Sequence, residues 1–115
     1  MSDPTSVFFY GTLRYAPLLD AVLGRAVAVQ SAEIKGHAVR QVVGEPFPIL
    51  VEAPDAVTEG VLAQGLSVED RARLDYYEGP YHYTLTDALV ETEGGPVPAQ
   101  VYRPGEGLWQ AGDVW

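Results

Sequence analysis

The run Val7-Phe8-Phe9-Tyr10, which stops at Gly11, limits the folds open to this chain more than any other feature. Four consecutive apolar and aromatic residues predict a short, buried strand. Gly11 allows a sharp turn and a close approach of another group to the backbone. A short helix is expected soon after, and backbone N–H groups near the start of a helix can bind an oxygen with negative character. The segment therefore predicts either a small oxyanion or carbonyl site or an ordinary strand-to-helix turn.

Two stretches carry the signals of a helix. Residues 16–24 place Pro17 in the first turn and Gly24 just past the end. Residues 67–77 begin with Ser67, which can cap a helix, and continue with two acids that favour its positive end. The sequence therefore predicts two short helices that lie far apart in the chain.

Strand-like segments cover most of the remaining chain. They are residues 26–34, 36–43, 47–51, 57–66, 83–92 and 97–102, and the glycine-rich link at 93–96 is typical of a hairpin. The helices are too few and too far apart for a repeating βαβ fold. The predicted fold class is α+β: a mixed-sheet, β-barrel-like domain with two or more flanking helices, formed by residues 1–115 as a single domain.

Charge and composition exclude several classes of function. The net charge is −9 and the seven basic residues are scattered, which argues against a nucleic-acid partner and against binding to an anionic membrane. The absence of cysteine excludes a thiol nucleophile, and the two histidines, His37 and His82, have no metal-ligand spacing. The sequence predicts no signal peptide and no transmembrane span. We therefore expect a cytoplasmic protein without a metal site.

Glu78 is the residue that the sequence places best for acid–base chemistry. If the second helix extends that far, Leu74 and Glu78 share one face. Leu74 is expected in the core, so Glu78 would lie near an apolar surface at the negative end of the helix dipole. Both surroundings raise the pKa of a carboxyl group, which suits a general acid or base near neutral pH. Tyr83 is a candidate hydrogen-bond partner, and a solvated glutamate at a frayed helix end is the alternative.

Three segments match the pattern of one known family. Tyr10-Gly11-Thr12-Leu13 matches a Y-G-[ST]-L loop, residues 74–79 match an L-D-x-[FY]-E-G segment, and Tyr83 falls where a tyrosine often follows. In these features the chain resembles the γ-glutamylcyclotransferase-like proteins, which include the plant AIG2-like proteins. The resemblance implies a mixed β-barrel with flanking helices and catalysis by Glu78. It also implies a γ-glutamyl group bound by Tyr10, Gly11, Thr12 and Leu13, mainly through their backbone, and by Tyr83.

The resemblance further implies a reaction. The expected activity is that of a γ-glutamyl cyclotransferase, of transferase or lyase type, which needs no cofactor. It acts on a small γ-glutamyl amide or peptide and releases 5-oxoproline and an amine. The match is closest to modules that precede a Nudix hydrolase domain in longer bacterial proteins, which implies such a linked partner in relatives. Leu85 stands where relatives often carry an arginine. That departure favours the alternative, a non-catalytic small-molecule-binding or regulatory module of the same fold.

Overall fold

The computed structural model of the chain describes residues 5–42, 48–78, 83–104 and 111–114. Some side chains within these ranges lie outside the description, among them those of Thr12, Glu78 and Tyr83. The described elements are strands, two α-helices and one 3₁₀ turn. In chain order they are β1 (Thr5–Phe9), η1 (Thr12–Arg14), α1 (Ala16–Leu23), β2 (Val29–Val42), β3 (Pro48–Leu66), α2 (Val68–Glu78), β4 (Tyr83–Thr92), β5 (Gly95–Pro104) and β6 (Ala111–Val114).

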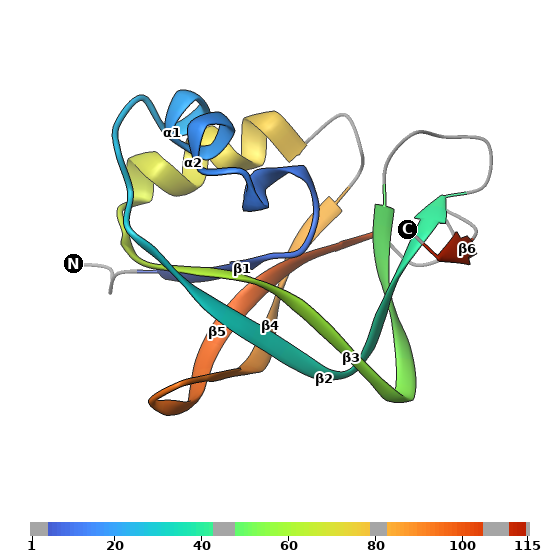
Figure 1. The fold of residues 1–115 in the computed structure, drawn as a ribbon. Helices are drawn as coiled ribbons and strands as arrows, with labels where there is room; N and C mark the ends of the chain where they lie inside the picture. The colour runs from blue at the N-terminus through green and yellow to red at the C-terminus, as the bar shows by residue number, and fades with distance from the viewer. Residues whose placement is uncertain (1–4, 43–47, 79–82, 105–110, 115) are drawn as a thin grey trace.

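Five of the described strands close into a barrel (Figure 1). Their order is β3-β1-β5-β4-β2, and β2 pairs again with β3, which closes the ring; β6 pairs with the far end of β2. Because β1 and β5 are parallel and the other pairs are antiparallel, the sheet is mixed. The helices α1 and α2 pack against each other on one side of the barrel. The predicted α+β fold, a mixed-sheet barrel with flanking helices, is therefore confirmed.

β2 and β3 are longer than the sequence indicates, and they bend. The register of β2 against β3 shifts at Gly36, whose φ is 75°. A bulge of this kind bends a strand without ending it. The segments predicted as separate strands at 26–34 and 36–43 therefore contribute to one strand, and those at 47–51 and 57–66 contribute to β3. The prediction of four short strands was wrong here: two long strands run together through the bend (Figure 1).

The predicted helix caps are present. Pro17 lies in the first turn of α1, and Gly24 ends it with φ of 73° and donates its N–H to the carbonyl of Asp20 at 2.8 Å. At the start of α2, the Ser67 hydroxyl accepts the N–H of Asp70 at 3.1 Å, and the Asp70 carboxylate accepts the N–H of Ser67 at 2.9 Å. This reciprocal pair is a capping box with aspartate in place of the usual glutamate. None of the described helices has the length and apolar character needed to cross a membrane.

Two hydrophobic clusters form the core, and β1 lies between them. Val7 and Phe9 belong to the cluster beneath the helices, whereas Phe8 and Tyr10 belong to the cluster inside the barrel. Side chains alternate along a strand, so a strand buried on both faces needs consecutive apolar residues, which explains this run. A side chain at Gly60 on β3 would collide with the backbone of Phe9 and the ring of Phe8. Glycine there is what allows β1 and β3 to lie so close.

Candidate active site

The loop after β1 is anchored at both of its ends. Tyr10 is 5% exposed and belongs to the cluster inside the barrel, whereas Leu13 is 2% exposed and belongs to the cluster beneath the helices. Between them the chain enters η1, where the carbonyl of Gly11 accepts both the backbone N–H of Arg14 at 3.2 Å and its Nε–H at 3.1 Å. These anchors hold the intervening backbone in one position, as a binding loop requires.

The last turn of α2 presents the backbone of Glu78 toward the barrel. Leu74 is fully buried, as predicted, and Tyr76 is 87% exposed. At about 100° per residue, position 78 lies about 40° from Leu74 and about 160° from Tyr76 around the helix axis. Position 78 is therefore on the side of the helix that faces the barrel. The Glu78 side chain lies outside the described residues, so its raised pKa and its catalytic role remain predictions.

Hydrogen bonds connect the loop to this helix turn through Tyr102 on β5. The hydroxyl of Tyr10 donates to the backbone carbonyl of Tyr102 at 2.6 Å. The hydroxyl of Tyr102 in turn donates to Oδ1 of Asp75 at 2.7 Å, and Tyr102 itself is only 4% exposed. Asp75 lies in α2, one turn before Glu78. Neither Asp75 nor Tyr102 was predicted as a site residue; the signal that was present is that a buried tyrosine needs a partner for its hydroxyl.

Apolar contacts join the same segments. Leu13, Leu74 and Tyr102 belong to one buried cluster, and Leu85 on β4 packs against it. Leu85 is paired with Tyr102 across the β4–β5 ladder, and Tyr83 lies two residues earlier on β4. The loop, the last turn of α2 and the start of β4 therefore meet at one end of the molecule (Figure 1).

All of the predicted site residues lie on these converging segments. They are Tyr10, Gly11, Thr12, Leu13, Glu78 and Tyr83. The side chains of Thr12, Glu78 and Tyr83 are outside the described part of the chain. The fold brings together the segments that carry Glu78 and the loop. A single cavity that both of them face is still a prediction.

A hollow of about 660 Å³ opens beside the loop. Tyr10 and Arg14 line one part of it, and β2 and β3 supply Arg40, Glu33 and Glu59. The lining of this hollow thus combines two basic and two acidic residues with the tyrosine that begins the loop. This hollow is compatible with a small polar substrate held near the loop.

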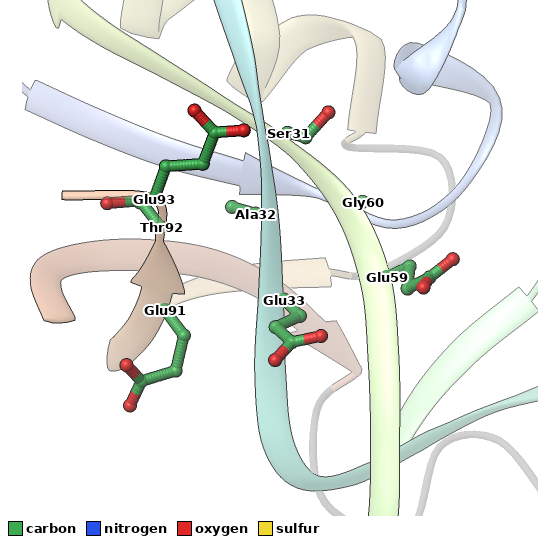
Figure 2. Close-up of a pocket in the computed structure, with 8 residues that line it drawn as sticks. All are labelled: Ser31, Ala32, Glu33, Glu59, Gly60, Glu91, Thr92 and Glu93. Carbon is green, nitrogen blue, oxygen red and sulfur yellow. The ribbon is translucent and has the colours of Figure 1, made fainter. Parts of the chain in front are cut away.

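A second pocket has four glutamates in its lining and no residue of the loop (Figure 2). Figure 2 shows the carboxylates of Glu33, Glu59, Glu91 and Glu93 pointing in different directions instead of converging on one centre. Across the described ranges, no group of three or more histidine, cysteine or acidic residues is arranged to hold a metal ion.

With this fold and loop geometry, the chain belongs to the family described as γ-glutamyl cyclotransferase, AIG2-like, whose model matches residues 7–113. The predicted family is therefore confirmed. No curated protein matches the chain.

Solved structures share the fold at low sequence identity. One is an Arabidopsis thaliana protein solved in solution, which is 20% identical with a TM-score of 0.79; the match covers 91% of this chain and 71% of that one. A protein named γ-glutamyl cyclotransferase is 14% identical with a TM-score of 0.80, over 95% of this chain and 70% of that one. A yeast γ-glutamyl cyclotransferase specific to glutathione is 17% identical with a TM-score of 0.68, over 96% and 72%. At these identities the likeness establishes the fold.

Proposed function

We propose that the protein is a γ-glutamyl cyclotransferase that converts a small γ-glutamyl amide or peptide into 5-oxoproline and a free amine. The observation that carries this proposal is the hydrogen-bond chain from Tyr10 through Tyr102 to Asp75. It joins the loop that matches Y-G-[ST]-L to the helix turn that ends at Glu78. Membership of the family supports the same reaction.

The reaction needs a proton acceptor and a site for developing negative charge. The α-amino group of the substrate attacks its own γ-carbonyl carbon, so that a C–N bond forms in a five-membered ring and the original amide C–N bond breaks. Glu78 accepts a proton from the α-ammonium group and then protonates the leaving nitrogen. The protons lost by the ammonium group end on the released amine, so no cofactor or other reactant is consumed.

The loop backbone supplies the second requirement. The N–H groups of Gly11 to Leu13 stabilise the oxyanion or hold the α-carboxylate of the substrate. Each donor that is aimed at a developing oxyanion is worth about 3 kcal/mol. Because Tyr10 and Leu13 are anchored in separate clusters, the loop is already ordered before substrate binds. This order favours catalysis, since no energy is needed to arrange the donors during the reaction.

The second candidate is a binding or regulatory module without turnover. It is favoured by Leu85, which packs against the buried cluster beside Tyr102 instead of providing the positive charge that relatives often have there. Such a module retains the loop and its affinity for γ-glutamyl compounds.

Detection of 5-oxoproline distinguishes the two candidates. The protein is incubated with γ-glutamyl dipeptides, glutathione and γ-glutamyl-ε-lysine, and the product is measured by mass spectrometry. The matched control substrates are α-glutamyl dipeptides, which have no amine to release from the γ-carbonyl. We expect 5-oxoproline from at least one γ-linked compound and none from the controls. No product across the panel, together with calorimetric binding of a γ-glutamyl compound, would establish the module instead.

A further inference from the structure

Among the described contacts between the last turn of α2 and the rest of the fold, two differ in kind. Leu74 is buried in the cluster beneath the helices, and Asp75 accepts the hydroxyl of Tyr102. Hydrophobic contact has no preferred direction, whereas a hydrogen bond depends on angle. Around the helix axis, position 78 lies about 40° from Leu74 on one side and about 60° from Asp75 on the other. The two contacts therefore stand on either side of position 78, and of these two only the hydrogen bond depends on angle.

Tyr102 also holds the start of the loop that follows β1. Its backbone carbonyl accepts the Tyr10 hydroxyl at 2.6 Å, while its own hydroxyl reaches Asp75 at 2.7 Å. One residue of β5 thus fixes the start of the loop with its main chain and the last turn of α2 with its side chain. The distance between loop and helix turn depends on both bonds.

We propose that Tyr102 and Asp75 are positioning residues, whose hydrogen bond sets the rotation and distance of the Glu78 backbone relative to the loop at Gly11. The expected effect on turnover rests on the proposed function. The hydrogen bond and its effect on the helix turn are independent of that function. Misplacement of a catalytic group by about 1 Å can cost about 100-fold in rate. Loss of this bond should therefore reduce turnover through the position of Glu78.

The variant Tyr102→Phe tests this most cleanly, because it removes only the hydroxyl and keeps the ring and the carbonyl that binds Tyr10. We expect kcat to fall about 10-fold or more, with KM close to that of the parent. Asp75→Ala should have the same effect, whereas Asp75→Asn keeps an oxygen acceptor and should recover most of the activity. The matched control is Tyr76→Phe, which removes an exposed hydroxyl from the same helix turn and should change nothing.

Hydrogen exchange measures the positioning without any assay of activity. In Tyr102→Phe, amides at residues 74–78 should exchange faster than in the parent, while those at residues 71–73 should be unchanged. If the parent is active, unaltered kcat in both Tyr102→Phe and Asp75→Ala overturns the inference. If the parent produces no 5-oxoproline from any substrate, the proposed function fails. The positioning role is then tested by hydrogen exchange alone. Equal exchange in parent and variant then overturns the positioning role, and faster exchange confined to residues 74–78 supports it.

Discussion

The two ends of α2 are held by different chemistry. At its start, Asp70 is 1% exposed and binds the guanidinium of Arg25 through two hydrogen bonds, Nε to Oδ1 at 3.1 Å and Nη2 to Oδ2 at 2.5 Å. The same carboxylate accepts the N–H of Ser67. At its end, Asp75 is an exposed residue and accepts a single hydroxyl, that of Tyr102. An ion pair between the buried Asp70 carboxylate and the half-exposed Arg25 holds one end, and a hydrogen bond to a neutral partner holds the other.

Under the proposed function, this difference separates stability from turnover along one helix. A buried charge that loses its partner is costly, so the Asp70 end contributes to the free energy of unfolding. A hydrogen bond between an exposed carboxylate and a tyrosine contributes less to that free energy, about 1 kcal/mol. Its importance lies in where it directs the helix turn next to the loop. Changes at the Asp70 end should therefore reduce stability, and changes at the Glu78 end should reduce turnover.

The largest expected effect is that of Glu78→Gln at the functional end. The substitution keeps the size of the side chain but removes the proton acceptor. Turnover should fall by about 10²–10⁴-fold, and the affinity for a γ-glutamyl ligand should persist because the loop amides are unchanged. The melting temperature should stay the same or rise slightly, since the mechanism requires a partly desolvated charge at this position and the substitution removes it. Turnover and melting are measured on one preparation, and full activity in the variant would contradict the proposed mechanism.

Asp70→Ala at the other end should reverse this pattern. The variant removes a helix cap and leaves the Arg25 guanidinium without its partner, so we expect a loss of about 2–3 kcal/mol in the free energy of unfolding. The loss stays below that of a fully buried pair because the Arg25 side chain is 49% exposed and can be solvated. Urea unfolding gives the free energy, and kcat is measured at low temperature where the variant is folded. A large loss of kcat per folded molecule would show that the Asp70 end of α2 also affects turnover.

Acid pH should weaken the Asp70 end in a defined interval. Hydrogen bonds from the Arg25 guanidinium lower the pKa of Asp70 from 3.8 to about 2. Because the folded-state pKa lies below the ordinary value, this carboxylate contributes its full stability above about pH 4. The contribution is lost as the pH falls from 3.8 toward 2. Unfolding midpoints measured between pH 6 and pH 2 should therefore fall more steeply in the parent than in Asp70→Asn, and equal slopes would refute the assignment.

Local signals predicted the parts of the fold that depend on neighbours in sequence. Gly24, Ser67 and the link at 93–96 each indicated a cap or a turn, and the structure has one at each place. The break that the sequence suggested near Gly36 is instead a bulge. Whether a glycine ends a strand or bends it depends on how the partner strand continues, and β3 continues past this point.

The contacts that hold the loop and the two ends of α2 could not be predicted from the sequence because they join residues far apart in the chain. Tyr10 and Tyr102 are 92 residues apart, and Arg25 and Asp70 are 45 apart. Motifs identified the loop and the segment around Glu78, but nothing near either segment indicates that a tyrosine on β5 connects them. Asp75 lay inside a recognised motif, and only the barrel topology gave it a partner.

A charge change remote from both ends of α2 should give the smallest effect and serves as the baseline for the comparison. Glu33 on β2 lies directly opposite Glu91 on β4, at the pair where these two strands meet. Like charges directly opposite each other destabilise a sheet, so Glu91→Gln should stabilise the fold by about 0.5 kcal/mol. The gain should shrink in 1 M salt, where charges are screened over about 3 Å.

The matched control is Glu93→Gln, which removes the same charge from the adjoining turn. Glu93 lacks this facing partner, so the control should stabilise the fold less. Neither variant should alter kcat, since the pocket that Glu91 and Glu93 line contains no residue of the loop. Equal gains from both variants would mean that the effect comes from net charge alone and not from the pair between β2 and β4.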